Sequence, residues 1–310
     1  MTTYTTMDDC ALTPLDWRLL GTAALPNSVI PGLINEGESG SLVAQAGAGK
    51  SLLMLEMAVN LALGRPILGE PTREPVPVMY VDMENTETEL ANRLRSMGHE
   101  PATLDGAPLQ YFSFPDLPPL DTVAGGRRLA LVAEQFNPTL IILDTISRLV
   151  EGKEDSADTW RNLYNCAMLP LRRQGRTVLR LDHQGHDLSK GARGSSAKRD
   201  DVDVAWILKR RENNVTLTLD KGRGLGHPQT ISLRRYSEPT RHLLASTTTT
   251  TTKVSDCAEA LEALGVPLGA TRDHAGKALR ERNYKFGNEV LGQALRLRSA
   301  SASCRTEGPH

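Results

Sequence analysis

A short glycine-rich loop separates an apolar run that ends at Ala44 from a helix-forming run over residues 52–63. Its sequence is Gln45-Ala46-Gly47-Ala48-Gly49-Lys50-Ser51. We interpret this order as strand, loop and helix, because the second run is apolar, rich in good helix formers and ends at Gly64. A loop of glycine and alanine at that point lets successive backbone N–H groups turn toward an anion at the positive end of the helix. The loop therefore predicts a phosphate-binding site in an α/β fold.

The loop fits the pattern G-x-x-x-x-G-K-[ST] except at its first position, where Ala44 replaces glycine. In that pattern Lys50 reaches the β- and γ-phosphates of a nucleotide, and the Ser51 hydroxyl binds Mg²⁺. We therefore expect ATP and Mg²⁺ as cofactors. The residues expected to contact the nucleotide are Gln45, Ala46, Gly47, Ala48, Gly49, Lys50, Ser51 and Leu52. The alternative is an ordinary glycine-rich turn before a core helix.

Apolar runs that alternate with helix-forming segments follow the loop. The expected strands are residues 78–82, 109–114, 139–144 and 177–182, and the expected helices are 86–97, 127–135 and 156–174. This alternation predicts a parallel sheet with right-handed crossovers. Later runs at residues 204–208, 215–219 and 230–233 fit antiparallel hairpins. The predicted fold class is therefore α/β, with a mostly parallel sheet and hairpins toward its C-terminal end.

Acidic residues stand where two of the predicted strands end. Asp144 closes the most apolar strand and suits the acid that holds a hydrated Mg²⁺. Asp82 and Glu84 close an earlier strand, and their spacing of two residues puts both on the same side. Because ligands of open α/β sheets sit at the carboxyl ends of strands, we assign Asp144 with Ser51 to the metal and Glu84 to the attacking water. An acid at a strand end can also simply cap the next turn.

Composition shifts divide the chain into five parts. We expect a lead-in over residues 1–27, an α/β core over 28–245, a Ser/Thr linker over 246–253, a helical module over 254–300 and a disordered tail over 301–310. We interpret residues 1–40 as a loose lead-in, in which Trp17, Leu19 and Leu20 are the candidate docking points and Pro26, Pro31 and Gly32 break any long element. Between Arg272 and Arg298 there are seven basic and three acidic residues. Three short basic helices fit a helix-turn-helix or winged-helix module, or equally a solvated helical cap.

Charge and cysteine content limit the classes of protein that this chain can belong to. The net charge is −1, but residues 160–240 hold sixteen Lys and Arg against eight Asp and Glu, a net of +8. A basic half beside a phosphate loop indicates nucleic acid, although a solvated basic face would look the same. The four cysteines are widely scattered, which favours neither a zinc cluster nor a disulfide framework. No apolar run is long enough to span a membrane, so we expect a cytoplasmic protein.

Five motifs in order resemble those of the RecA-fold ATPases, and most closely the plasmid RepA-type and DnaB-type hexameric replicative helicases. They are the loop at 46–51, Asp82-Met83-Glu84-Asn85, the strand 140–144, Asp182-His183-Gln184-Gly185-His186 and Arg193-Gly194-Ser195-Ser196-Ala197. The similarity covers about residues 28–236. It implies a RecA-like core, ATP hydrolysis and a hexameric ring that acts on single-stranded DNA.

The resemblance also implies roles for residues beyond the phosphate loop. His183 would sense the γ-phosphate of the nucleotide. The loop 186–196 would face single-stranded DNA in the central channel, and Lys190, Arg193 and Lys198 would contact the phosphates of that DNA. Lys221 and Arg223 match a basic pair that reaches the nucleotide of the neighbouring subunit, with Arg223 as the arginine finger. An exposed basic hairpin turn is the alternative for that pair.

Two other functions fit the same motifs. A RecA- or RadA-like recombination ATPase would share every nucleotide-binding residue, and a nucleotide-gated DNA-binding initiator or regulator would use the C-terminal helices to read a site. One residue departs from the family pattern, because Arg180 lies where an aliphatic residue is usual. We expect either that this strand is near an edge or that Arg180 has a carboxylate partner.

Overall fold

A computed structural model of the chain describes residues 16–20, 27–71, 74–183, 198–245, 254, 257–258, 260–262, 264–282, 284 and 286–303. The chain divides into two compact units, residues 1–243 and 244–310, which are described separately below. None of the described helices is both long enough and apolar enough to cross a membrane.

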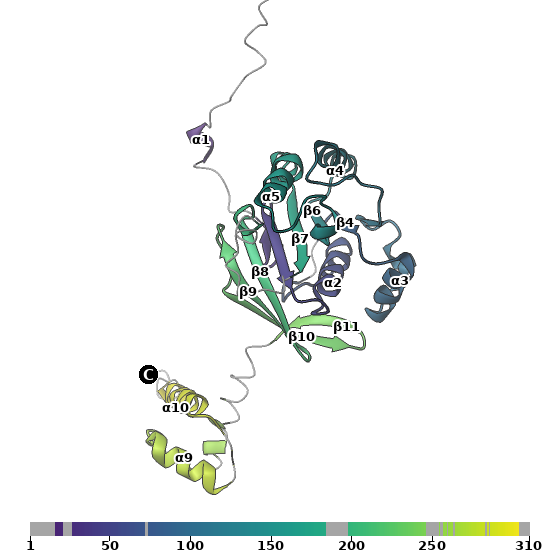
Figure 1. Cartoon of the computed structure of the whole chain (residues 1–310). Helices are drawn as coiled ribbons and strands as arrows, with labels where there is room; N and C mark the ends of the chain where they lie inside the picture. Colours follow the sequence, from purple (N-terminus) through teal and green to yellow (C-terminus); the bar gives the residue numbers. More distant parts are fainter. Residues whose placement is uncertain are drawn as a thin grey trace, which may run out of the picture. The chain divides into compact units, whose positions relative to one another are not determined.

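The first unit is built on a nine-stranded mixed sheet (Figure 1). Six strands are parallel: β3 (Ser39–Ala44), β4 (Val78–Asp82), β5 (Leu109–Ser113), β6 (Leu140–Asp144), β7 (Thr177–His183) and β8 (Val204–Arg211). The antiparallel part adds β9 (Asn214–Gly222), β10 (Thr230–Ser237) and β11 (Thr240–Leu244). The order across the sheet is β11-β10-β9-β8-β3-β7-β6-β4-β5. The predicted fold class is confirmed, and β11 is a strand that the sequence patterns did not indicate.

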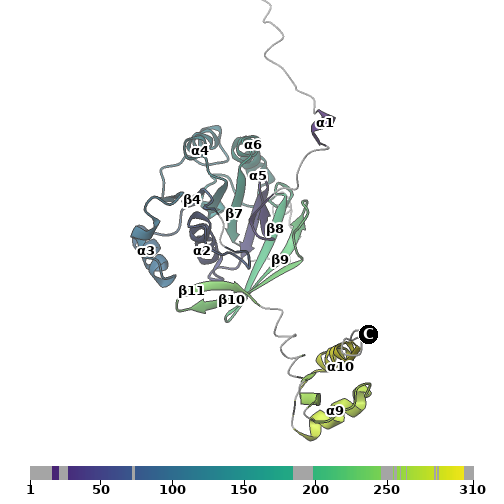
Figure 2. The same ribbon diagram turned by 180° about the vertical axis from the view of Figure 1, so that it is seen from behind.

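Helices cover both faces of this sheet, as the two opposite views show (Figures 1 and 2). On one face lies α2 (Lys50–Ala62), with α3 (Glu87–Ser96) packed against it. On the other lie α4 (Val123–Phe136), α5 (Ala157–Leu163) and α6 (Leu169–Arg173), which share a separate core cluster with the sheet. Residues that alternate along β4 and β6 divide between the two clusters, since Tyr80 and Ile142 belong to the first and Val81 and Ile141 to the second.

The segment before residue 40 is more regular than the sequence patterns indicated. Strands β1 (Ser28–Ile30) and β2 (Ile34–Asn35) form a hairpin whose residues Ile30, Leu33 and Ile34 are buried with α2. The described elements before residue 39 are all short, as expected, and the hairpin forms because four apolar side chains within seven residues are buried. Trp17, in the short helix α1 (Trp17–Leu20), is 77% exposed and does not dock.

The expected helix over residues 156–174 consists of three pieces. A π-helical turn (Tyr164–Met168) joins α5 to α6, so the irregularity begins before Pro170, where we expected a kink. The cause is close packing against α4, because a Cβ on Gly126 would lie 1.8 Å from the carbonyl oxygen of Cys166. Only glycine lets the two backbones approach so closely.

Arg180 lies in the middle of the sheet, since β7 pairs with β3 on one side and β6 on the other. The first expectation for it, an edge strand, is therefore wrong. Its guanidinium lies 5.5 Å from the ring centre of Trp160 and donates a hydrogen bond to the carbonyl oxygen of Lys198. Burial lowers the pKa of Arg180, and the charges of Asp182 and Asp201 oppose that effect. Nearby carboxylates thus compensate the buried charge.

The second unit is helical. Its long helices are α9 (Arg272–Glu281), capped by the Thr271 hydroxyl, and α10 (Asn288–Ser303). Their apolar faces enclose a core that includes Cys257, Leu261, Leu279 and Ala294. Several exposed residues of the unit are basic, while its core is apolar, as is usual for a small globular domain.

Candidate nucleotide site

The phosphate loop connects the end of β3 to the start of α2. Gly47 and Gly49 have φ of +73° and +99°, a left-handed conformation that favours glycine. Helix α2 begins at Lys50 without a side-chain cap, so its first N–H groups are free to bind an anion. Ala44, the departure from the usual pattern, is fully buried in the core, where its Cβ is accommodated. The loop therefore retains the backbone shape that a phosphate needs.

Three of the predicted catalytic side chains lie together beyond the carboxyl ends of β3, β4 and β7. Lys50 Nζ lies 3.3 Å from His183 Nε2, and His183 Nε2 in turn lies 3.2 Å from Glu84 Oε1. His183 ends β7, and Glu84 follows the last residue of β4 by two positions. The structure thus brings together residues that are 133 and 99 positions apart in the chain.

Glu84 is held in place by its neighbours. Its backbone N–H donates to Asp82 Oδ1 at 2.7 Å, and Arg148 Nε lies 3.9 Å from its carboxylate. Asp82 also accepts hydrogen bonds from the backbone and side-chain amides of Asn85 and from the Tyr111 hydroxyl. Asp82 is therefore the acid that caps the turn, while Glu84 remains available for chemistry.

Asp144 lies at the end of β6 and is completely buried. Tyr80 donates its hydroxyl to Oδ2 at 2.8 Å, whereas the buried Oδ1 has no hydrogen-bond partner among the described residues. Burial raises the pKa of Asp144, while Tyr80, the Ser51 hydroxyl and the charge of Lys50 favour the ionised form. An orphaned carboxylate oxygen close to Ser51 is where a hydrated Mg²⁺ would complete its shell.

The donor set fits a magnesium ion that arrives with a nucleotide. Within the described part of the chain, no cluster of three or more His, Cys, Asp or Glu side chains can hold a metal. Mg²⁺ keeps several waters and is usually bound through one or two protein oxygens and the phosphates of its substrate. Ser51 and Asp144 would hold the ion. When bound, the ion would neutralise negative charge on the phosphates.

Two arginines that sequence reasoning missed lie beside the phosphate loop. A Cβ built on Gly49 would lie 3.7 Å from Arg210 Nη1 and 3.9 Å from Arg235 Nη1. These side chains come from β8 and β10, and neither forms an ion pair with another described residue. Partial burial and the charge of Arg210 lower the pKa of Arg235. Two neighbouring cations with no anion between them create a positive site next to the loop.

Lys221 and Arg223 lie near the amino ends of the parallel strands, at the opposite end of the sheet from the phosphate loop. Gly222 pairs with Val204 at the start of β8, whereas the phosphate loop follows Ala44, which pairs with Leu208. Four residues of strand separate these levels, about 13 Å along the strand. Lys221 Nζ donates to the carbonyl oxygens of Arg199 and Asp200 at 2.9 Å, and Arg223 Nη2 donates to the latter at 3.2 Å. Neither side chain is placed at the nucleotide loop of its own chain.

The predicted DNA contacts fall partly outside the structure's described residues. Lys190 and Arg193 lie in the segment 184–197, which is not described. Lys198 differs from the expectation, since only 17% of its side chain is exposed. Its ammonium lies 2.5 Å from Asp182 Oδ2, 3.2 Å from Glu154 Oε2 and 4.2 Å from the ring centre of Trp160. These partners hold the Lys198 side chain within the fold.

Comparison with protein families agrees with this geometry. The model of a family described as AAA domain, AAA_25, matches residues 8–189 of this chain. The match spans more than half of the 310 residues and includes β3, the phosphate loop, Glu84, Asp144 and His183. The chain therefore belongs to the AAA_25 family of AAA domains, P-loop NTPases of the RecA-like superfamily.

Proposed function

We propose that this protein is an ATP-hydrolysing, ring-forming motor that moves along single-stranded DNA, similar to the RepA-type replicative helicases. The observation that supports the proposal is the separation of charged residues between the two ends of the parallel strands. Lys50, Glu84 and His183 lie at the carboxyl end, while Lys221 and Arg223 lie near the amino end. Because this cation pair does not lie at the nucleotide loop of its own chain, we propose that it serves the nucleotide of a neighbouring copy.

The His183 ring can serve only one of its two partners at a time. Nε2 either accepts from Lys50 or donates to Glu84, because a ring nitrogen is a donor or an acceptor but not both. A γ-phosphate that takes Lys50 frees Nε2 to carry its proton toward Glu84 or the phosphate. His183 thus reports phosphate occupancy to the residue that orients the attacking water.

Each residue then has a defined task in hydrolysis. The backbone of the phosphate loop and Lys50 bind the phosphates, and Ser51 and Asp144 hold the metal. Glu84 accepts a hydrogen bond from the attacking water and aligns it with the γ-phosphate. Arg223 of a neighbouring copy offsets the negative charge that develops in the transition state, with Lys221 beside it.

Mixing two inactive variants tests the shared site. Lys50→Ala removes the phosphate cation, Arg223→Ala removes the finger, and each alone should abolish turnover. A mixed ring contains some interfaces with an intact Lys50 and an intact Arg223, about one quarter at an equal ratio. We expect mixing to restore a corresponding part of the ATP turnover. Arg234→Ala, an exposed arginine on β10, is the matched control and should remain active.

Two results would refute this proposal. If the mixture stays inactive although each variant is folded and Arg223→Ala still binds ATP, Arg223 does not act across an interface. If wild-type turnover ignores both single-stranded DNA and dilution of the protein, the site is self-contained and the motor is rejected.

A second function is favoured by the compact helical unit at residues 244–310. A nucleotide-gated DNA-binding regulator would use these helices to recognise a specific sequence. Truncation after Thr252 separates the two functions, because a regulator would lose sequence-specific binding and keep its ATP turnover. A motor would retain DNA-stimulated turnover and show no preference among DNA sequences.

A further inference from the structure

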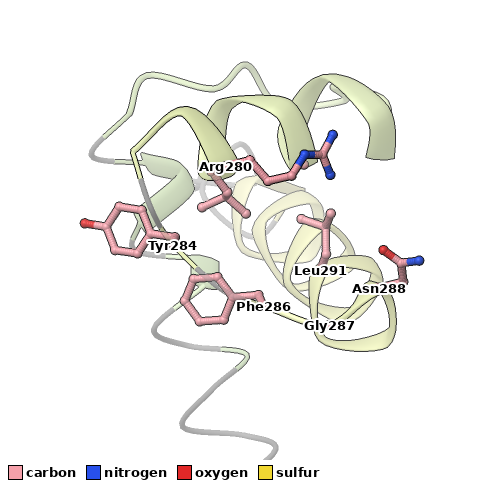
Figure 3. Close-up of a pocket in the computed structure, with 8 residues that line it drawn as sticks. Arg280, Tyr284, Phe286, Gly287, Asn288 and Leu291 are labelled. Atoms are coloured by element: carbon pink, nitrogen blue, oxygen red, sulfur yellow. The ribbon is translucent and has the colours of Figure 1, made fainter.

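The C-terminal unit contains a hollow of about 440 Å³ where α9 ends and α10 begins. Its lining includes Leu279 and Leu291 from the two helices, and Tyr284, Phe286 and Gly287 from the connection between them (Figure 3). This volume lies within the range of pockets that hold small organic ligands. The hollow belongs to none of the nucleotide machinery of the first unit.

One end of the hollow is aromatic. The rings of Tyr284 and Phe286 are nearly parallel, with an interplanar angle of 13° and centroids 6.1 Å apart. Tyr284 is 43% exposed, and its backbone N–H donates to the Leu279 carbonyl oxygen at 3.0 Å. An exposed ring on a fixed backbone can stack on a planar ligand with little loss of conformational entropy.

The lining of the hollow also includes a cation. Figure 3 shows the Arg280 guanidinium above Leu291, and Asn288 on the side of Leu291 away from the two rings. A Cβ on Gly276 would lie 3.2 Å from Arg280 Nη1, so glycine leaves room for the guanidinium along α9. No carboxylate among the described residues pairs with Arg280. Within the described part of the chain, the guanidinium is therefore not neutralised by a carboxylate and can donate to an anion.

A nucleotide combines the two features that this lining requires. It has a flat base for the rings and a phosphate for the guanidinium, and a sugar joins these two groups. The surroundings favour a polyanion, because residues 272–298 hold seven basic and three acidic residues. Exposed rings are free to stack only on bases that are not already stacked in a duplex.

We propose that this hollow binds one unpaired nucleotide of single-stranded DNA, with its base on Tyr284 and Phe286 and its phosphate at Arg280. The inference rests on the proposed function in one respect, since a motor on DNA brings the strand to the protein. The site gives the chain a contact with DNA that persists in the absence of ATP.

Photocrosslinking and binding of the full chain test the proposal. A short oligodeoxynucleotide carrying 5-iododeoxyuridine should crosslink within residues 284–286 without nucleotide present, because this base reacts with stacked aromatic rings. Tyr284→Ala should weaken binding of the unmodified oligonucleotide about tenfold, while Tyr284→Phe changes it less than about twofold. Arg280→Gln should weaken binding and lower the salt slope by about one.

Arg282→Gln is the matched control, because Arg282 is exposed beside the hollow but does not line it. Equal effects of Arg280→Gln and Arg282→Gln would mean diffuse charge and would overturn the proposal, as would an unchanged affinity of Tyr284→Ala. Tighter binding of an acidic, phenylalanine-containing peptide than of DNA would also overturn it in favour of a protein partner.

The same experiment separates this proposal from the motor. Crosslinks only within the first unit, together with DNA-stimulated turnover, would reject the hollow and keep the motor. Crosslinks at residues 284–286 with turnover that ignores DNA would keep the hollow and reject the motor.

Discussion

Replacing Tyr80 with phenylalanine isolates one hydrogen bond to the metal-binding acid. The phenol donates to Asp144 Oδ2 at 2.8 Å, and both side chains are almost completely buried. Tyr80→Phe keeps the ring and its stacking on Tyr111, whose centroid is 4.9 Å away. A hydrogen bond to a charged group contributes about 1.5–3 kcal/mol, so the unfolding free energy should fall by about that amount where Asp144 is ionised.

The same loss should change the pH dependence of activity. Burial already raises the pKa of Asp144, and the bond from Tyr80 opposes this because it favours the ionised form. Without that bond the pKa rises further, and about 1.4 kcal/mol corresponds to one pH unit. If hydrolysis needs ionised Asp144, the acidic limb of ATP turnover should move upward by about one unit, and saturation should require more Mg²⁺ near that limb.

Tyr111→Phe is the matched control for this experiment. It removes a buried phenol from the same stacked pair, but the carboxylate it contacts, Asp82, keeps the donors from Glu84 and Asn85. Its cost should also be about 1.5–3 kcal/mol, because its phenol too donates to a carboxylate, but the acidic limb should not move. Urea denaturation and turnover at several pH and Mg²⁺ values measure both variants. Identical pH profiles for Tyr80→Phe and Tyr111→Phe would refute the assignment of Asp144.

Three further outcomes follow from the same contacts. Arg210→Gln should raise the KM for ATP several-fold and leave the unfolding free energy nearly unchanged, since its guanidinium lies beside the loop without an ion-pair partner among the described residues; steady-state kinetics and denaturation would contradict this if stability fell instead. Glu56→Gln should cost about 1–3 kcal/mol in thermal or urea unfolding, because the buried carboxylate accepts from the backbone N–H of His242 and contacts its ring nitrogen at 2.5 Å. Native labelling with iodoacetamide should modify half-exposed Cys166 before Cys257, whose burial raises its pKa; equal rates would show that the second unit opens readily.

Strands β4 and β6 could be predicted because each is a run of four apolar or aromatic residues closed by an aspartate. The strand predicted over residues 78–82 is β4 as the structure has it, and the helix predicted over residues 86–97 is α3, which begins with a capping box of Thr86 and Glu89. A strand that is buried on both faces is a short apolar run, so it can be recognised from the residues of that run alone. The approach of Lys50, Glu84 and His183 to one another could be predicted because the carboxyl ends of parallel strands lie at the same end of a sheet.

Other features depend on partners that are distant in sequence. Arg210 and Arg235 look like ordinary exposed positions of a hairpin, and only the placement of β10 brings them to Gly49. Tyr80 is one of four apolar or aromatic residues in β4 until Asp144 is known to accept a hydrogen bond from its hydroxyl. The signal that could have suggested this pair is an aromatic residue two positions before the register partner of a strand-tip acid, as Tyr80 is two positions before Asp82, the partner of Asp144. Lys198 is a further case, because its contacts with Asp182 and Glu154 within the fold could not be predicted from its place near the expected DNA loop.

The contact between Glu56 and His242 links the phosphate loop to the end of the core. Glu56 lies on α2, six residues after Lys50, and His242 lies on β11, from which the chain leaves the first unit. Helix α2 is the element that binding at the phosphate loop acts on first, because its N-terminal N–H groups bind the anion. A movement of α2 would therefore strain the two buried hydrogen bonds between Glu56 and His242 unless β11 moved with it. Chains of packed and hydrogen-bonded side chains can couple two distant sites. The contact between Glu56 and His242, which are 186 positions apart, connects α2 at the phosphate loop to β11.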